Sequence, residues 1–392
     1  MAVGYPVEEV AEGKARVLVP RLDESPGVPE QRLRSMAPVF YNPVMKTNRD
    51  TAVLVLRAHQ RLVGRGVAAC EPMAGSGVRG IRLALEVEGV ERVVMGDLSP
   101  SAVCLGEMNV ERNGVSDRAV FRLLDANLLL SLHCYPGGRL DYVDVDPYGS
   151  PAPFMDTAVR SVRNHGVVAF TATDMAPLCG VNPGACLRKY GAAPLAGGFC
   201  HETAVRLLTG AVVRAAAVHE RAATPLFSYY SDHYVRVYCR LDRGKRRADD
   251  QLAQMGYIKH CPRCLHRETS MDSKAEPCTV CGSETRVGGP LWLREQSDPE
   301  ILSSMLEDST LGYLAGSKAV KLVRLAVDER GYPPWFYDID SVCSQVGTRS
   351  LATEEALTRI REAGYRVSRA HYGDRAIKTD ASMVELKKVL GG

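Results

Sequence analysis

The fold of this chain is decided by residues 67–80, which read VAACEPMAGSGVRG. Apolar residues at 67–70 predict a strand, and the pattern at 78–87 predicts the helix that follows it. Three glycines between the two elements match the pattern G-x-G-x-x-G: Gly75, Gly77 and Gly80. Such glycines let a ligand approach the backbone at the N-terminus of a helix. The stretch therefore predicts a strand–helix unit with a ligand site at its turn.

Strand and helix patterns continue to alternate beyond this unit. Strand patterns occupy residues 93–96, 119–124, 140–145 and 166–171, and helix patterns occupy residues 51–63, 99–113 and 154–161. This alternation predicts an α/β fold of the Rossmann-like type, with a parallel sheet whose ligands bind beyond the carboxyl ends of its strands. Before the first helix, residues 38–50 predict a loop rich in Asn and Pro, and residues 25–30 predict a Pro-rich link.

Acidic residues close the successive strands of this sheet: Glu71, Asp97, Asp125 and Asp146. Asp97 stands where a carboxylate receives ribose hydroxyls, and Asp125 where one bonds an adenine amino group, although a single Asp more commonly caps a helix. Dinucleotides place a pyrophosphate at the helix N-terminus, whereas S-adenosyl-L-methionine (SAM) meets an acid just before the glycines. The charge of Glu71 therefore favours SAM over the cofactor of an NAD-dependent oxidoreductase.

The turn Asp146-Pro147-Tyr148-Gly149 suits chemistry on an amino group attached to a flat ring. Pro147 restricts the backbone around Asp146, and Gly149 permits a sharp turn, so Asp146 and Tyr148 are presented together at the end of a strand. A carboxylate accepts a hydrogen bond from an exocyclic N–H, and an aromatic ring stacks on the base that carries it. The alternative is an ordinary turn between a strand and a loop.

Several ordered blocks of the chain resemble the tRNA guanine-26 N2-dimethyltransferases along nearly the whole length. The blocks are residues 39–43 and 48–50, 77–82, 144–151, 171–174, 176–180, 186–190, Tyr229 and 232–234. The resemblance implies that SAM is contacted by Arg49, Arg79, Asp97, Asp125 and Ala126. It also implies that Asp146 is catalytic, beside Tyr148, where the family more often has Phe.

The resemblance further implies a SAM-dependent methyltransferase that acts on tRNA. Its product would be N2,N2-dimethylguanosine at guanine 26, and the base would leave the folded tRNA to enter the pocket. Cys179 offers an alternative, because some RNA cytosine-C5 methyltransferases use a cysteine nucleophile near a corresponding strand. Guanine N2 needs no covalent adduct, so the turn at Asp146 fits amino methylation better. No obligate protein partner is evident in the sequence.

Two C-x2-C pairs lie in the second half of the chain, with thirteen residues between them: Cys261, Cys264, Cys278 and Cys281. This spacing predicts a tetrahedral zinc site of four thiolates, since each short pair supplies two ligands. A closed shell of four cysteines leaves no open position, so we expect the zinc to be structural. A redox pair or unligated thiols are the alternatives.

The basic cluster at residues 240–247 indicates a boundary between two domains. We expect a methyltransferase domain at residues 1–243 and an α+β domain at residues 244–392, which contains a zinc ribbon-like module at about 257–292. Helix patterns at 339–346 and 350–363, with strand patterns near 365–367 and 376–379, predict a winged-helix-like tail. That tail either binds tRNA or packs against the catalytic domain.

Composition adds little about partners but limits the class of protein. The net charge of the 392 residues is +3, which permits an RNA partner without requiring one. The chain has no apolar run of membrane-spanning length, and its first ten residues lack a basic segment followed by an apolar one. We expect a soluble, cytoplasmic protein with reduced thiols and no membrane contact.

Overall fold

The computed structural model describes residues 3–22 and 29–391, which form two compact units. The first unit contains the described residues up to Pro147, together with Pro153–Phe170 and Ser303–Lys321. The second contains Tyr148–Ala152, Thr171–Leu302 and the described residues from Leu322 onward. Most of the predicted Pro-rich link, residues 25–28, lies outside the described residues.

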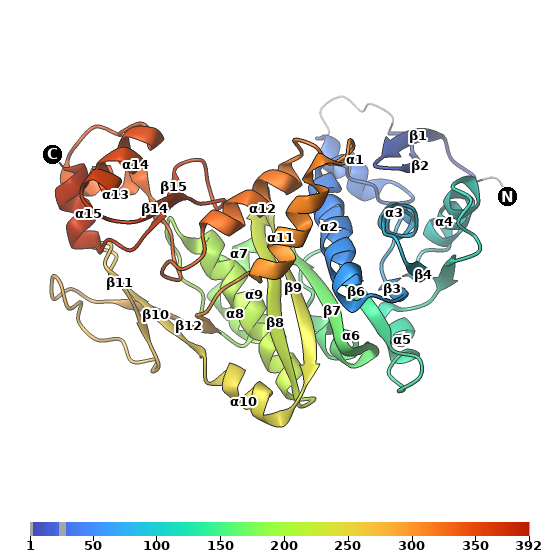
Figure 1. The fold of residues 1–392 in the computed structure, drawn as a ribbon, viewed down its shortest axis with the longest axis horizontal. Helices are drawn as coiled ribbons and strands as arrows, with labels where there is room; N and C mark the ends of the chain where they lie inside the picture. The colour runs from blue at the N-terminus through green and yellow to red at the C-terminus, as the bar shows by residue number, and fades with distance from the viewer. Residues whose placement is uncertain (1–2, 23–28, 392) are drawn as a thin grey trace. The chain divides into compact units, whose positions relative to one another are not determined.

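A parallel sheet forms the centre of the first unit (Figure 1). Its strands lie in the order β5-β4-β3-β6-β7, and each neighbouring pair is parallel. Helix α3 packs against β4, α4 against β5 and α6 against β6. The bounds are β3 Val67–Glu71, α3 Val78–Glu86, β4 Val90–Asp97, α4 Pro100–Arg112, β5 Ala119–Leu123, α5 Ala126–Ser131, β6 Leu140–Val145, α6 Met155–Ser161 and β7 Val162–Ala172. The predicted Rossmann-like α/β fold is confirmed.

The strand order of this sheet reverses at β3, which lies between β4 and β6. Chain connections leave β3 and β6 toward opposite sides at such a point, and α/β folds of this type bind ligands beyond the carboxyl ends of these strands. Apolar side chains at the centre of the strands are fully buried, as at Ala69, Val93 and Val143. Burial of this apolar surface stabilises the sheet, at about 25 cal/mol for each Å² removed from water. The rigid sheet thus presents the residues at its strand ends.

Helix α2 (Lys46–Val63) begins earlier than predicted, because the short helix η1 (Pro43–Met45) leads directly into it. The prediction of a loop up to residue 50 was therefore wrong for residues 43–50. Asn42 caps η1 by accepting a hydrogen bond from the Val44 amide at 3.0 Å. Asn48 and Arg49, two of the polar residues that suggested a loop, are instead buried and bound to charged side chains.

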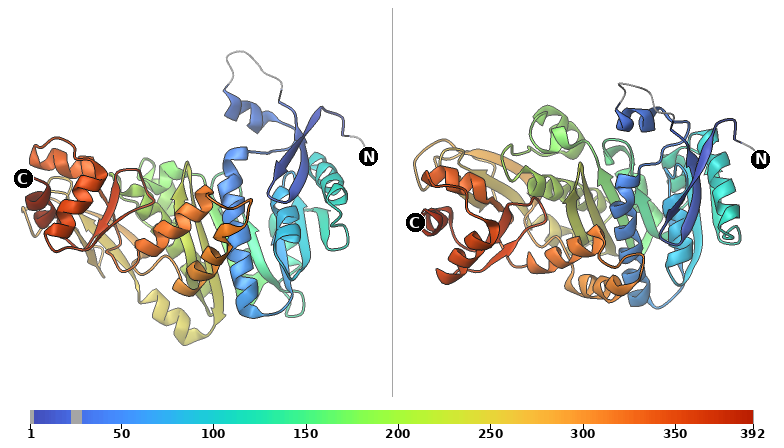
Figure 2. Two further views of the ribbon diagram at one scale, coloured as in Figure 1. Left: turned by 45° about the horizontal axis from the view of Figure 1, so that its top comes forward. Right: turned by 90° about the horizontal axis from the view of Figure 1, so that it is seen from above.

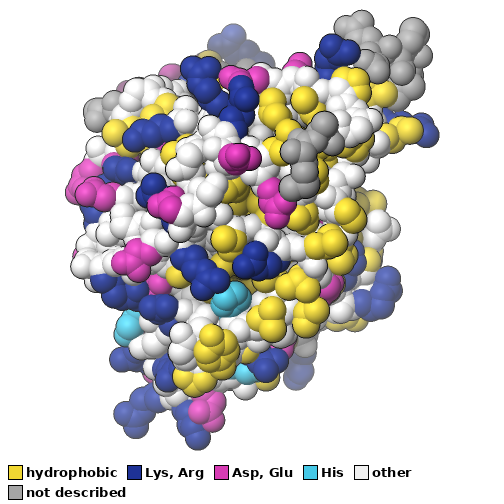
Figure 3. Space-filling view, turned by 90° about the vertical axis from the view of Figure 1, so that its right-hand side faces the viewer, with side chains coloured by type: hydrophobic (Ala, Val, Ile, Leu, Met, Phe, Trp, Pro, Cys, Tyr) yellow, Lys and Arg dark blue, Asp and Glu magenta, His cyan; other side chains and the backbone are white. Residues whose placement is uncertain are grey.

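The N-terminal hairpin of β1 (Val7–Glu12) and β2 (Ala15–Pro20) packs against α3 and α4 (Figure 2). Helix α1 (Glu30–Met36) follows it in the chain. On the face of the molecule near the N-terminus, apolar side chains gather in patches beside Lys and Arg side chains (Figure 3). Exposed apolar residues of the first unit include Leu98, Leu123, Leu128, Leu132 and Tyr135.

The second unit contains an antiparallel strand pair and a small three-stranded sheet. Strand β8 (Arg221–Ser231) pairs with β9 (Tyr234–Arg243), and α9 (Cys200–Ala217) packs against both. The small sheet has the order β11-β10-β12, with β10 at Met255–His260, β11 at Arg267–Ser270 and β12 at Arg286–Trp292. The predicted boundary after Arg243 coincides with the end of β9 and stays a prediction.

The C-terminal part of the second unit holds another three-stranded sheet, with the order β13-β15-β14. Its elements are β13 Tyr337–Asp338, α13 Ile339–Val346, α14 Thr353–Glu362, β14 Val367–Arg369, β15 Ala376–Thr379 and α15 Met383–Leu390. The remaining α-helices of the described residues are α7 Met175–Leu178, α8 Pro183–Tyr190, α10 Lys245–Leu252, α11 Pro299–Glu307 and α12 Lys318–Asp328. The assignment of this region as a winged helix stays a prediction. None of the helices in the described ranges is both long and apolar enough to cross a membrane.

Candidate active site

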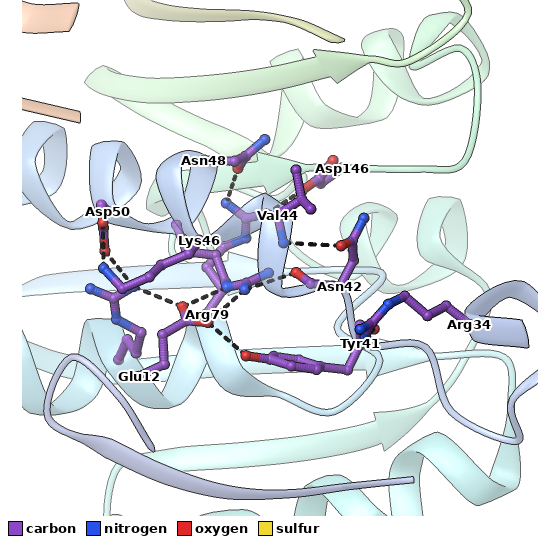
Figure 4. A network of polar contacts seen from close by, with 12 residues as sticks. Glu12, Arg34, Tyr41, Asn42, Val44, Lys46, Asn48, Asp50, Arg79 and Asp146 are labelled. Atoms are coloured by element: carbon purple, nitrogen blue, oxygen red, sulfur yellow. Dashed lines mark hydrogen bonds and ion pairs between the residues drawn. The ribbon is translucent and has the colours of Figure 1, made fainter. Parts of the chain in front are cut away.

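Arg79, in the first turn of α3, lies at the centre of the polar residues that meet at the end of the sheet (Figure 4). Its Nε donates to Oε1 of Glu71 at 2.9 Å, and its Nη1 donates to Oδ1 of Asn48 at 2.6 Å. Nη1 also lies 3.3 Å from Oδ2 of Asp144, and Nη2 donates to Oδ2 of Asp146. One guanidinium therefore connects the end of β3, the end of β6 and helix α2.

Burial makes these contacts electrostatically strong. The side chain of Arg79 is 4% exposed, whereas that of Asp146 keeps 14% exposure. The fork of the guanidinium fixes the direction of each carboxylate it binds. Asp146, the predicted catalytic residue, thus has one carboxylate oxygen held by Arg79.

Glu71 lies in the same group and has a perturbed pKa. Burial raises its pKa to about 7, while Arg79 lowers it and the neighbouring Asp144 raises it. Its Oε2 also accepts a hydrogen bond from the Gly80 amide at 3.0 Å. Glu71 therefore connects the end of β3 to the first turn of α3. This contact fixes both ends of the glycine turn that lies between them.

The glycine turn is built as the sequence predicts. Gly75 and Gly77 have positive φ angles of 52° and 77°, a conformation that side chains with a Cβ rarely adopt. A Cβ on Gly77 would also lie 2.8 Å from the ring of Phe121. Asp97 holds the turn from the next strand, since its Oδ2 accepts from the Gly75 amide and its Oδ1 from the Ser99 amide, both at 2.9 Å.

Asp125 and Ala126 form the start of α5. The Asp125 carboxylate accepts hydrogen bonds from the amides of Asn127 at 2.9 Å and Leu128 at 3.1 Å, so it caps this helix. Capping was the alternative that the sequence suggested for this residue, and it leaves the second carboxylate oxygen for a ligand. Ala126 is 4% exposed.

Arg49, expected from the family resemblance to contact SAM, is bound by Glu12 of the N-terminal hairpin. Its Nε and Nη2 donate to the two carboxylate oxygens of Glu12, each at 2.6 Å. Nη2 also donates to the Asn42 carbonyl at 3.1 Å, and the guanidinium lies 5.3 Å from the centre of the Tyr41 ring. Burial raises the pKa of Glu12, but Arg49 and Arg82 outweigh burial and bring the pKa to about 2.

Sequence reasoning missed several residues of this network: Glu12, Asn48 and Asp144. Glu12 and Arg49 are 37 positions apart, and no periodic pattern relates them. Asp144 had a signal, because it is an acid between two valines of a strand pattern, two positions before Asp146. A buried acid in such a strand needs partners, and here these include Arg79 and the hydroxyl of Tyr142.

The five residues directly after Pro147, Tyr148–Ala152, belong to the second unit. Tyr148 is 68% exposed, and Gly149 has a φ of 82°. The Gly149 amide donates to the Thr173 hydroxyl at 2.8 Å, and the Thr173 amide donates to the Gly149 carbonyl at 2.9 Å. Tyr190 extends this support by accepting from Ser150 at 2.9 Å and donating to Asp174 at 2.5 Å. The turn that carries Tyr148 is thus fixed by side chains.

Cys179 is a poor nucleophile in this structure. Its hydrogen bond with Cys200 and its burial raise the pKa of the Cys179 thiol. Since the thiolate is the reactive form of cysteine, this environment argues against a covalent role at neutral pH.

The four predicted zinc ligands come together in the second unit. All four Sγ atoms lie within 4.8 Å of one another, with Cys261 and Cys281 at 3.5 Å and Cys264 and Cys278 at 3.6 Å. Zinc–sulfur bonds of about 2.3 Å in a tetrahedron require sulfur atoms about 3.8 Å apart. The side chains therefore fit a structural zinc ion, between β10 and β12.

A glycine turn at the head of α3 and acids at the ends of parallel strands define a Rossmann-like α/β protein with a ligand site at the strand ends. The family model described as "TRM: N2,N2-dimethylguanosine tRNA methyltransferase" matches residues 13–391. The chain belongs to this family. Membership sets aside the NAD-dependent oxidoreductase and the cytosine methyltransferase as alternatives.

Relatives and a solved structure agree with this assignment. The tRNA (guanine(26)-N(2))-dimethyltransferase of Methanothermobacter thermautotrophicus is 39% identical over 98% of both chains. The protein of the same name from Methanopyrus kandleri is 38% identical, over 98% of this chain and 96% of its own. A structure of Trm1 from Pyrococcus horikoshii with S-adenosyl-L-methionine is 33% identical, covers 97% of this chain and 99% of its own, and has a TM-score of 0.84.

Proposed function

We propose that this protein transfers methyl groups from SAM to the exocyclic N2 of guanine 26 in tRNA, giving N2,N2-dimethylguanosine. The observation that carries the proposal is near full-length similarity to relatives named for this activity. The structure of Trm1 from Pyrococcus horikoshii with SAM supports the choice of methyl donor. A cytoplasmic location stays a prediction.

The residues at the strand ends suit the three parts of a SAM molecule. Glu71, Gly75 and Gly77 would surround the methionine part, and Asp97 would receive the ribose hydroxyls. Asp125 and Ala126 would meet the adenine. Arg49 and Arg79, already bound to carboxylates, would act near SAM mainly by fixing Glu12 and the acids around Glu71.

Asp146 would accept a hydrogen bond from the N2–H of guanine. The N2 lone pair is delocalised into the ring, so catalysis depends on aligning the nitrogen with the methyl carbon of the sulfonium. As the N–C bond forms and the S–C bond breaks, the proton on N2 passes to Asp146 or to water. Arg79 would hold the Asp146 carboxylate in a fixed orientation. Tyr148 would stack on the guanine base, which leaves the tRNA core to enter the site.

The four-cysteine cluster would hold a structural zinc ion, and the C-terminal elements α13 to α15 would form a winged-helix-like tail. Supporting the zinc proposal are the C-x2-C spacing and the mutual distances of the sulfur atoms. The tail has two candidate roles, contact with tRNA or packing, as the sequence suggested.

The test is to incubate the protein with labelled SAM and an unmodified tRNA transcript, then identify the methylated nucleosides by mass spectrometry. We expect N2,N2-dimethylguanosine from the transcript and none from a matched transcript with adenine at position 26. Methylated cytosine, or an unchanged yield from the adenine transcript, would contradict the proposal.

A further inference from the structure

A second cluster of metal-ligand side chains lies in the second unit, apart from the four-cysteine cluster. It consists of Cys179, Cys200 and His201, whose two Sγ atoms and one ring nitrogen lie within 4.8 Å of one another. Cys179 follows the last residue of α7, and Cys200 is the first residue of α9. All three residues are partly buried. Folding therefore brings together three ligands from the ends of two helices.

The His201 ring is held in the manner of a metal ligand. Its Nδ1 lies 3.3 Å from the carbonyl oxygen of Tyr372. A carbonyl can only accept, so Nδ1 carries the hydrogen and Nε2 keeps its lone pair. The ring stacks on Tyr230, with centroids 3.8 Å apart and planes 7° apart. Metal-binding histidines are commonly fixed by such a hydrogen bond from the second ring nitrogen.

Cys200 occupies a position that favours a thiolate. It begins the 18-residue helix α9, whose N-terminus carries partial positive charge. Two sulfur donors and one imidazole form a set that selects a soft or borderline cation over Mg²⁺ or Ca²⁺.

We propose that Cys179, Cys200 and His201 bind one Zn²⁺ ion, with the fourth coordination position left to water or an added ligand. Each thiol that is still protonated releases its proton as the Zn–S bond forms, so binding weakens as the pH falls. The ion would join the end of α7 to the start of α9. The segment before α7 contains Thr173 and Asp174, which support the turn that carries Tyr148.

The test measures zinc bound per chain in full-length, reduced protein after saturation with Zn²⁺ and removal of free metal. We expect wild type to hold one equivalent more than Cys179→Ser or His201→Gln. Cys186→Ser, which changes a buried cysteine on α8, should keep the wild-type content. Because the result is a difference, it holds whether or not the four-cysteine cluster is filled. Circular dichroism confirms that each variant is folded.

Saturation with Co²⁺ provides a second measurement. We expect the thiolate-to-cobalt absorption of wild type to exceed that of Cys200→Ser, and to match that of Cys186→Ser. Equal zinc content in wild type, Cys179→Ser and His201→Gln would overturn the proposal. A disulfide between Cys179 and Cys200, in protein that takes up no further zinc after reduction, would also overturn it and indicate a redox pair.

Discussion

At the scale of single residues, Arg79 joins the acids that close two neighbouring strands, Glu71 at the end of β3 and Asp146 after β6. A guanidinium that binds several carboxylates determines their directions, and an ammonium cannot reproduce that geometry. Arg79 is therefore a positioning residue for Asp146, in addition to any contact with SAM.

Arg79→Lys separates these two roles. If positioning dominates, the variant should lose kcat by about 10²-fold, the scale expected from a small misplacement of a catalytic group. The Kd for SAM, measured by calorimetry, should change much less. Arg92→Lys alters an exposed arginine on β4 and should match wild type. A loss of SAM affinity as large as the loss of kcat would assign Arg79 to the cofactor instead.

Tyr148 is exposed and stands where the resembled family more often has Phe. Since stacking needs only the ring, Tyr148→Phe should keep kcat/KM for tRNA within about threefold. Tyr148→Ala should lower it about 5- to 150-fold, which corresponds to the roughly 1–3 kcal/mol of one stacked base. Steady-state kinetics on a tRNA transcript measure both variants. Equal activity of Tyr148→Ala and wild type would exclude stacking.

At the scale of elements, Glu12 connects the hairpin β1–β2 to both α2 and α3. Glu12 binds Arg49 of α2 and Arg82 of α3, and all three side chains are buried. A buried carboxylate with two cationic partners stabilises the fold only while it is ionised.

The stability that Glu12 contributes through Arg49 and Arg82 should depend on pH in the acid range. The pKa of Glu12 is about 2 in the folded chain, against an ordinary 4.5, so its contribution is complete above pH 4.5 and is lost as the pH falls toward 2. The free energy of unfolding of wild type and of Glu12→Gln is measured with urea. As the pH falls from 4.5 toward 2, the difference between the two proteins should shrink by up to about 3 kcal/mol. Glu8→Gln, on an exposed position of the same strand, is the control. A difference between Glu12→Gln and wild type that stays constant with pH would contradict this account.

The elements differ in how well the sequence predicted them. Strand β6 was predicted with its observed bounds, because its apolar run is short and ends at a turn with Pro and Gly. The start of α2 was missed, since the burial of Arg49 through Glu12 overrides a polar, loop-like composition. Strand β13 has two residues and depends on pairing with β15, which no local pattern shows.

The residues of the candidate site also differ in how well the sequence predicted them. The glycine turn and the acids at the strand ends follow local rules, so Gly75, Gly77 and Asp97 could be proposed as site residues from the sequence. Their partners depend on the tertiary fold. The bond between Arg79 and Asp146 joins residues 67 positions apart, and only the structure brings them together.

At the scale of the whole molecule, the family match covers both units, including the four-cysteine cluster. A zinc ion there would stabilise the small sheet of β10 to β12, because structural zinc sites contribute directly to folding. Cys278→Ser should lower the zinc content by one equivalent and raise hydrogen exchange in β10 and β12. Cys134→Ser, which lies outside both clusters, should change neither quantity. Unchanged exchange after loss of zinc would show that the ion is not structural.

The most direct test of the central claim concerns Asp146 as the acceptor for guanine N2. Single-turnover transfer from labelled SAM to tRNA, measured beside SAM affinity, separates catalysis from cofactor binding. Asp146→Ala should lower the transfer rate by about 10²-fold or more, as expected for removal of a general base, while the Kd for SAM changes by less than about threefold. A rate close to that of wild type, or a loss of SAM affinity equal to the loss of rate, would contradict the claim.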